Sequence, residues 1–310
     1  MKTEFAIDVR NLVKRFGDKV AVNGVSIQMP YGQVWGFLGP NGSGKTTTIR
    51  MICGLLNTTE GEGTCLGFDI AKDSRDIKIR TGYMTQRFSF WGDLTIRENL
   101  EFVARLYQLP KMKAKVDETL ENLGLSHRQH QVADALSGGW KQRLALAAVT
   151  MHKPELLLLD EPTAGVDPQA RRDFWDEIHR LSSNGMTVLV STHYMDEAER
   201  CDRIAYLANG VMVTKGTVGD IIDKSGLITF TAEGDQIREF ATHLKDEPGI
   251  EHVAYFGSAL HVSGMNREHL EAALKAKARD GVTWKEVRPS LEDSFIALMK
   301  SSGADTRAHQ

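Results

Sequence analysis

The stretch "GPNGSGKTTT", from Gly39 to Thr48, determines how the rest of the chain is interpreted. Gly39, Gly44, Lys45 and Thr46 fit an eight-residue pattern in which a glycine-rich loop stands between a strand and a helix. The preceding "QVWGFLG" is typical of a buried strand, and "TTTIRMICGLL" is typical of a helix. The pattern therefore predicts a P-loop, whose backbone N–H groups surround a phosphate, and a glycine-rich turn with a chance lysine is the weaker alternative.

In a P-loop the lysine reaches the β- and γ-phosphates of a nucleotide as a point charge, and the next threonine supplies a hydroxyl ligand to Mg²⁺. We also expect Thr47 to cap the helix and to contact the α-phosphate. The nucleotide-binding residues predicted from the loop are Gly39, Pro40, Asn41, Gly42, Ser43, Gly44, Lys45, Thr46 and Thr47, and Thr46 is also a predicted metal ligand.

Two acidic residues follow a second apolar run, "LLLLDEP", at residues 156–162. The run has the length of a strand covered on both faces, so Asp160 should lie at the carboxyl end of a strand beside the P-loop strand. There it can hold Mg²⁺, while Glu161, one residue further, points elsewhere and can orient an attacking water. An acidic pair that only caps the next turn is the alternative, and the P-loop upstream makes it the weaker one.

Composition limits the class of protein. The chain has 310 residues, of which 41% are hydrophobic and 25% charged, enough for one large domain and a smaller one. A net charge of −3 lacks the basic excess expected of a nucleic-acid partner, and the scattered Cys53, Cys65 and Cys201 favour a reducing cytosol. No signal peptide or apolar run of about 20 residues is present in the sequence, so any membrane role should come through a partner.

Along the chain, alternating and apolar strands at the N-terminus and around residues 156–216 predict a parallel-sheet α/β domain over residues 1–220. A helical insertion interrupts it at about residues 88–151, from "IRENLEFVARLYQL" to "SGGWKQRLALAAVTM". Short alternating strands and helices, among them the helix "QIREFATHLKD" at residues 236–246, then predict a small α+β domain over residues 225–300. The polar tail, residues 301–310, is predicted to be disordered.

Five motifs occur in a fixed order: the P-loop, "LSGG" at residues 136–139, "DEP" at 160–162, "AGVD" at 164–167 and "STH" at 191–193. Over about residues 1–220 this order resembles the nucleotide-binding subunits of ABC transporters, a P-loop ATPase fold with a helical subdomain. In that family two subunits pack head to tail on ATP. The resemblance implies that Ser137, Gly138 and Gly139 bind the γ-phosphate held by the partner's P-loop, with a helix N-terminus carrying about half a positive charge.

Other positions are assigned by the same resemblance. Gln86, at the end of the strand "GYMTQ", resembles the glutamine that contacts Mg²⁺ and the attacking water. His193 resembles the switch histidine that bonds the γ-phosphate, and Asp167 resembles the aspartate that crosses the dimer interface. Phe16, in "RFGDKVAV", resembles the aromatic residue that stacks on adenine. Taken singly, each residue has a structural alternative; for Phe16 it is closure of the core.

One position departs from the family pattern, because Trp140 stands where glutamine usually follows the two glycines. An indole has only one donor and a large area, so either the fine contacts to the partner's nucleotide change or Trp140 packs under the helical insertion. After Gln86, the aromatic residues Phe88, Phe90 and Trp91 either belong to the core of the insertion or face a helix of a membrane permease, as the family implies.

The C-terminal domain resembles the accessory domain of type 2 ABC exporters, since "RPSLEDSFIALMK" is similar to the ending typical of that branch. The resemblance implies an ATPase subunit at the cytoplasmic face of a membrane, working as a homodimer with a separate permease and without nucleic acid. A soluble ABC protein acting on the ribosome usually has two cassettes or a basic tail, and a small-molecule kinase gives no reason for "LSGG" or for His193. The transported substrate cannot be read from this sequence.

Overall fold

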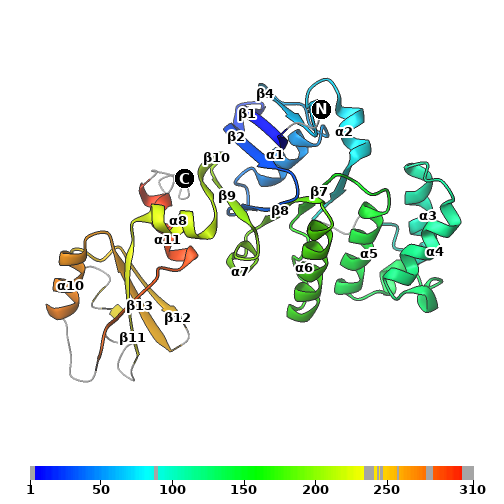
Figure 1. Cartoon of the computed structure of the whole chain (residues 1–310). Helices are drawn as coiled ribbons and strands as arrows, with labels where there is room; N and C mark the ends of the chain where they lie inside the picture. Colours follow the sequence, from blue (N-terminus) through cyan, green and yellow to red (C-terminus); the bar gives the residue numbers. More distant parts are fainter. Residues whose placement is uncertain are drawn as a thin grey trace. The chain divides into compact units, whose positions relative to one another are not determined.

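The chain forms two compact units, Met1–Met212 and Val213–Gln310 (Figure 1). The computed structural model describes residues 4–86, 90–233, 241–242, 244, 247–256, 258–276 and 282–301. The described helices are α1 (Lys45–Ile52), α2 (Ser74–Arg80), α3 (Ile96–Leu106), α4 (Met112–Asn122), α5 (Gly138–Thr150), α6 (Pro168–Ser183), α7 (Met195–Ala198), α8 (Val218–Ser225), α10 (Arg267–Ala276) and α11 (Leu291–Ser301), with 3₁₀ turns at Ser126–Arg128 and Ala133–Ala135.

The strands form three sheets. They are β1 (Phe5–Phe16), β2 (Lys19–Pro30), β3 (Val34–Leu38), β4 (Glu60–Cys65), β5 (Phe68–Asp69), β6 (Thr81–Met84), β7 (Leu156–Asp160), β8 (Thr187–Thr192), β9 (Arg203–Ala208), β10 (Val211–Gly216), β11 (Ile228–Glu233), β12 (His252–Phe256), β13 (Ala259–Gly264) and β14 (Lys285–Val287). The sheet orders are β2-β1-β4-β5, β10-β9-β3-β8-β7-β6 and β12-β13-β11-β14.

The six-stranded sheet positions the predicted site. Its strands β3, β7 and β8 are buried along their whole length, as their continuous apolar sequences predict. They run parallel, with β8 between β3 and β7, so that Leu38 pairs with Thr192 and Asp160 pairs with Ser191. The P-loop, the acidic pair and the "STH" segment therefore leave the sheet at one edge. The predicted parallel-sheet α/β fold is confirmed.

A second, antiparallel sheet packs on the same core. The hydrophobic residues of β1, β2 and α1 form one buried cluster with those of β3, β7 and β8. The strand β4 has the sequence "EGEGTC" and was not among the predicted strands. Its glycines fit against β1, because a Cβ at Gly61 would lie 2.4 Å from the carbonyl oxygen of Asn11, and at Gly63 2.4 Å from that of Asp8.

The helical insertion has a core of its own. Leu100 of α3, Leu120 of α4 and Leu144 of α5 belong to one buried cluster, so the predicted run of helices is present. The helix α3 begins at a capping box between Thr95 and Glu98, eight residues after the start predicted for the insertion. Phe88 lies outside the described residues.

The second unit contains the antiparallel four-stranded sheet with α8, α10 and α11, which is the predicted α+β class. The helix α8 belongs to it, so the domain boundary predicted at residues 220–225 falls inside a helix of this unit and remains a prediction. A helix predicted at residues 236–246 lies mostly outside the described residues. So does the tail predicted to be disordered, apart from Ser301, the last residue of α11.

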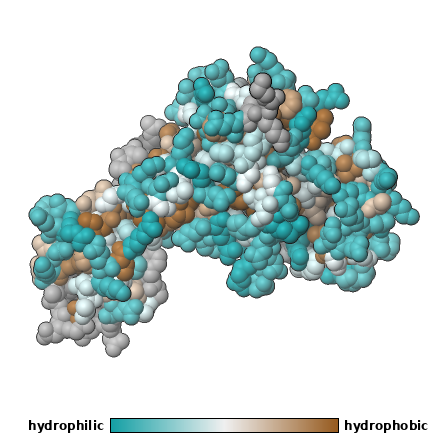
Figure 2. All heavy atoms as spheres, in the orientation of Figure 1, coloured by the Kyte–Doolittle hydropathy of each residue, from teal (hydrophilic) through white to brown (hydrophobic). Residues whose placement is uncertain are grey.

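The described helices include none with the length and apolar character that crossing a membrane requires. On the face drawn in Figure 2, hydrophilic residues cover most of the coloured surface and hydrophobic residues form small separate areas. The large apolar side chains are therefore found mainly in the buried clusters of the two units.

Candidate active site

The P-loop has the backbone that its glycines permit. At Gly39 φ is 148°, and a Cβ there would lie 2.0 Å from the carbonyl oxygen of Leu207. At Gly44 φ is 100°, and a Cβ would lie 2.7 Å from the carbonyl oxygen of Ala21. Only glycine fits these two positions, so the loop stays tight and its N–H groups stay uncovered by side chains.

The Lys45 side chain lies under this loop and is 4% exposed. Its ammonium donates hydrogen bonds to the carbonyl oxygens of Gly39, at 2.7 Å, and Pro40, at 3.2 Å. It also lies 3.3 Å from Oε1 of Glu161. The cation is thus placed inside the turn of the loop, where the charge of a bound phosphate would be.

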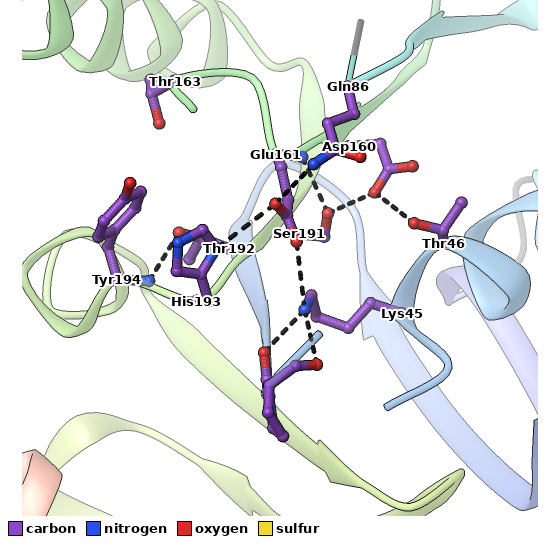
Figure 3. A network of polar contacts seen from close by, with 12 residues as sticks. Lys45, Thr46, Gln86, Asp160, Glu161, Thr163, Ser191, Thr192, His193 and Tyr194 are labelled. Carbon is purple, nitrogen blue, oxygen red and sulfur yellow. Dashed lines mark hydrogen bonds and ion pairs between the residues drawn. The ribbon is translucent and has the colours of Figure 1, made fainter. Parts of the chain in front are cut away.

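Asp160 accepts hydrogen bonds from three elements. Its Oδ1 accepts from the hydroxyls of Thr46, at 2.9 Å, and Ser191, at 2.7 Å (Figure 3). Its Oδ2 accepts from the Tyr83 hydroxyl at 3.4 Å. Burial raises the pKa of Tyr83, which keeps the phenol protonated as a donor, and Arg50 in turn donates to the same phenol oxygen at 3.3 Å. These contacts fix the Asp160 carboxylate beside the Thr46 hydroxyl.

Glu161 has a different backbone and different partners from Asp160. Its φ is 47°, in the left-handed region that non-glycine residues rarely adopt, and its N–H donates to the carbonyl oxygen and the hydroxyl of Ser191. The carboxylate accepts from Nε2 of Gln86 at 3.1 Å and lies 3.4 Å from Nδ1 of His193. Figure 3 shows Lys45, Gln86 and His193 around this one carboxylate.

The structure thus brings together six predicted site residues: Lys45, Thr46, Gln86, Asp160, Glu161 and His193. Sequence reasoning missed Tyr83 and Ser191, which hold Asp160 and Glu161 from neighbouring strands. The sequence signal that could have found them is their position next to predicted site residues: Tyr83 lies three residues before Gln86, and Ser191 is the first residue of "STH".

The predicted trans-acting residues lie at the junction of α5 and α6. Ser137 is the N-cap of α5, with extended backbone, and Asp167 caps α6 by accepting from the N–H groups of Gln169 and Ala170. A Cβ at Gly139 would lie 2.6 Å from the Cβ of Ala170, so this glycine also permits close packing of the two helices. In the described part of the chain no hydrogen bond or ion pair joins Ser137 to the P-loop of its own subunit.

Two aromatic positions can also be placed. Trp140 packs against the hydrophobic core of the helical insertion, and the Arg143 guanidinium lies 4.9 Å from the centre of its ring. This is the packing that the sequence offered as an alternative to a nucleotide contact. Phe16 is 51% exposed, with Lys14 Nζ 5.2 Å from its ring centre, so its ring is accessible and does not close the core.

The fold and the site define a P-loop nucleotide-binding protein with an acidic pair at the end of the neighbouring strand. A family model described as ABC transporter matches residues 22–164. The Nod factor export ATP-binding protein I of Rhizobium meliloti (strain 1021) is 35% identical over 301 residues, 96% of this chain and 89% of its own length. The chain belongs to the ABC transporter family, as one of its ATP-binding proteins.

Further relatives are named for drug resistance or multidrug transport. The linearmycin resistance ATP-binding protein LnrL of Bacillus subtilis (strain 168) is 39% identical over 234 residues, 74% of this chain and 75% of its own length. The probable multidrug ABC transporter ATP-binding protein YbhF of Escherichia coli (strain K12) is 44% identical over 220 residues, 70% of this chain. The chain spans only 38% of the length of YbhF.

Solved structures agree on the fold. An ATP-binding subunit of an ABC transporter matches with a TM-score of 0.65 and 27% identity, over 71% of this chain and 93% of its own. The ATP-binding cassette MJ0796, in a dimeric post-hydrolysis state with ADP and phosphate, matches with a TM-score of 0.62 and 26% identity, over 68% of this chain and 98% of its own. The predicted ABC ATPase fold is confirmed.

Proposed function

We propose that the chain is the ATP-hydrolysing subunit of an ABC exporter, which dimerises head to tail on ATP and drives a separate membrane permease. The observation that carries the proposal is the convergence of Lys45, Thr46, Asp160, Glu161 and His193 at one edge of the parallel sheet. The relatives named for Nod factor export and for multidrug transport support the export part, and the dimeric MJ0796 cassette supports the dimer part.

Each residue has a role that follows from its place. The loop N–H groups and Lys45 bind the β- and γ-phosphates of ATP, and the accessible ring of Phe16 stacks on the adenine. Gln86 and Glu161 bracket the position of the attacking water, which Glu161 orients and polarises. His193, beside Glu161, bonds the γ-phosphate and loses that bond after hydrolysis.

The donor set fits Mg²⁺. The Thr46 hydroxyl and the Asp160 carboxylate lie 2.9 Å apart, and both offer the hard oxygen ligands that bind Mg²⁺ together with nucleotide phosphates. The Gln86 amide is the third predicted ligand. When bound, Mg²⁺ neutralises charge that develops on the phosphates. The residues of this chain hold their oxygens in place through Ser191 and Tyr83.

The partner subunit completes each site. Ser137, Gly138 and Gly139 at the N-terminus of α5 bind the γ-phosphate on the opposite P-loop, and Asp167 lies at the same interface. Because Trp140 packs inside its own subunit, the contribution of the trans side comes from the Ser137 hydroxyl and the helix N-terminus.

The aromatic surface after Gln86 is proposed to receive the permease. Trp91 is 45% exposed and makes an edge-to-face contact with Phe102, their ring centres 4.3 Å apart, while Leu106 is exposed on the same helix as Phe102. Phe90 packs against the core of the insertion beneath. Exposed aromatic side chains of this kind anchor a partner helix, so the chain is proposed to act at the cytoplasmic face of the membrane through its permease.

Lys45→Ala tests the proposal in a phosphate-release assay of the whole chain with MgATP. Turnover should fall by about 10²- to 10³-fold and nucleotide binding should weaken, because the β- and γ-phosphates lose their cation. Lys72→Ala, at a lysine whose side chain is 80% exposed, is the matched control and should stay within about twofold of the wild type. Equal turnover in Lys45→Ala and the wild type would remove the P-loop assignment.

A further inference from the structure

Glu197 is a fully buried carboxylate that the proposed roles do not use. It lies in α7 and is 0% exposed. Its Oε1 accepts a hydrogen bond from the Thr163 hydroxyl, and its Oε2 accepts from the Thr192 hydroxyl at 2.6 Å. The compensating cation is Arg171 of α6, whose Nε lies 3.6 Å from Oε1. Removing a charge from water is costly, and two hydroxyl donors and a guanidinium offset that cost here.

The two hydroxyls belong to the segments that carry the reacting groups. Thr163 lies two residues after Glu161, and Thr192 immediately precedes His193 (Figure 3). The Thr192 hydroxyl also accepts from the N–H of Tyr194 at 3.0 Å, which closes the turn around His193. One carboxylate is therefore bonded to both segments whose side chains meet at Glu161 and His193.

Arg171 extends the same set of contacts into α6. Its guanidinium lies 4.4 Å from the ring centre of Tyr194 and 3.6 Å from Oδ2 of Asp196. The helix α6 begins at the cap residue Asp167, four positions before Arg171. The contacts of Glu197 thus join β8, the segment after β7 and the helix that follows the "AGVD" motif.

We infer that Glu197 is a positioning residue for ATP hydrolysis: it sets the spacing of Glu161 and His193 without touching the nucleotide. The inference rests on the proposed ATPase function. Glu161 has a backbone that persists only where its surroundings hold it, and a displacement of about 1 Å at a reacting group can cost about 100-fold in rate. If Glu197 served only to close the fold around α7, its loss would act equally on every step.

The first test is Glu197→Gln in the whole chain. The amide keeps the shape of the side chain but loses one acceptor and the charge that faces Arg171. We expect kcat to fall by about 10- to 100-fold while KM and the Kd for MgATP stay within about threefold, since Lys45 and the loop are unchanged. Glu199→Gln, at an exposed glutamate two residues further on, is the matched control and should match the wild type.

The second test places Glu197→Gln in the Glu161→Gln background and measures the residual single-turnover rate with labelled ATP. If Glu197 acts through Glu161, Glu197→Gln should lower the rate of the Glu161→Gln chain by less than about twofold. The same change should lower the rate of the otherwise wild-type chain at least tenfold. A purely structural role would lower both backgrounds by the same factor, and that result would overturn the inference. Wild-type turnover in Glu197→Gln would overturn it as well.

Thr192 gives a test that does not depend on how well Glu197→Gln folds. Thr192→Ser keeps the hydroxyl bonded to Glu197, whereas Thr192→Val removes it with little change of volume. We expect the valine variant to lose at least about tenfold in kcat and the serine variant to stay within about threefold. Equal rates in the two would contradict the inference. A wild-type chain without turnover would instead contradict the proposed ATPase function, and the inference would fall with it.

Discussion

The two units of the chain bury polar side chains in different ways. In the first unit, the charged Lys45, Asp160, Glu161 and Glu197 are all buried. In the described part of the second unit the buried charged residue is Asp293, which accepts from the Ser290 hydroxyl at 2.6 Å and lies 3.3 Å from Nε2 of His252. The buried charged residues of the first unit join several helices and strands. Asp293 instead caps the start of α11 and contacts the strand β12 through His252.

Sheet geometry explains the difference. Parallel strands all end at one edge, so the residues that follow β3, β7 and β8 converge there, although more than a hundred positions separate the end of β3 from the ends of β7 and β8 in sequence. The antiparallel sheet of the second unit alternates its ends, and its buried hydroxyls pair across neighbouring strands, as Thr229 and Ser263 do at 2.7 Å. The buried charges therefore converge on one site in the first unit, while the buried polar groups of the second unit pair locally.

A pair of carboxylate substitutions provides the strongest test of this contrast. Glu161→Gln should lower ATP turnover by about 100-fold or more while ATP still binds, because the water loses its polarising group and the loop is intact. Asp293→Asn should lower the free energy of unfolding of the second unit by about 1–2 kcal/mol, because Ser290 and His252 lose their charged partner. ATP turnover should stay within about threefold of the wild type. Phosphate release and calorimetric unfolding of both variants measure the two effects.

Glu161→Gln should also accumulate an ATP-bound dimer, which size-exclusion chromatography with MgATP detects. A strictly monomeric profile would count against the head-to-tail arrangement, and a large loss of turnover in Asp293→Asn would show that the second unit takes part in hydrolysis.

A loss of comparable size separates the two halves of the composite site. Ser137→Arg should abolish hydrolysis, because bulk and misplaced charge enter the γ-phosphate site of the opposite subunit, while ATP binding to the same chain persists through Lys45. Ser126→Arg, at an exposed serine of the same insertion, is the matched control and should retain both. Loss of ATP binding in Ser137→Arg would place Ser137 in its own subunit's site.

Mixing two inactive chains sharpens this test. In a dimer of Lys45→Ala with Ser137→Arg, one composite site carries both changes and the other carries neither. Activity should return if one intact site can turn over alone. Because the two sites can instead depend on each other, the binding measurement on Ser137→Arg decides the assignment of Ser137.

The parts that sequence could predict are those specified by local pattern. The P-loop glycines, the apolar strands and the order of the short motifs led to Lys45, Asp160, Glu161 and His193, which the structure brings together. The strand β4 was missed because its glutamates and glycines have low strand propensity, and it is held by pairing with β1 and β5. Propensity carries no information about such a partner.

The supporting residues were missed for a related reason. Tyr83, Ser191 and Glu197 are ordinary polar residues at strand ends or in a short helix, and each acquires a role only when the sheet places it beside another motif. The position of Trp140 also required three dimensions, since only packing shows that its ring lies against the insertion core under Arg143.

A smaller change is expected when the second unit is removed. Deleting residues 217–310 leaves the six-stranded sheet and every predicted nucleotide-binding residue in place, and it takes α8 away together with its partner α11. ATP turnover should therefore persist within about tenfold of the whole chain, measured by phosphate release. A folded truncation that binds no ATP would show that the second unit completes the nucleotide site.

The smallest expected effect is a dependence of first-unit stability on pH that comes from His152. Burial lowers the pKa of His152 to about 4, and its ring stacks on Tyr107 with the ring centres 3.8 Å apart. In the unfolded chain the same histidine takes up a proton near its ordinary pKa of about 6.5, so acidification between these two pKa values favours the unfolded state.

Because the ring is only partly buried, the loss of unfolding free energy at pH 5 should be about 1 kcal/mol, or about 2–4 °C in Tm. His152→Phe keeps the stacking and removes the titration, so calorimetry from pH 7 to 5 should show a shallower fall of the first-unit Tm and no change in the second unit. Equal slopes in the variant and the wild type would show that this histidine does not carry the acid sensitivity of the first unit.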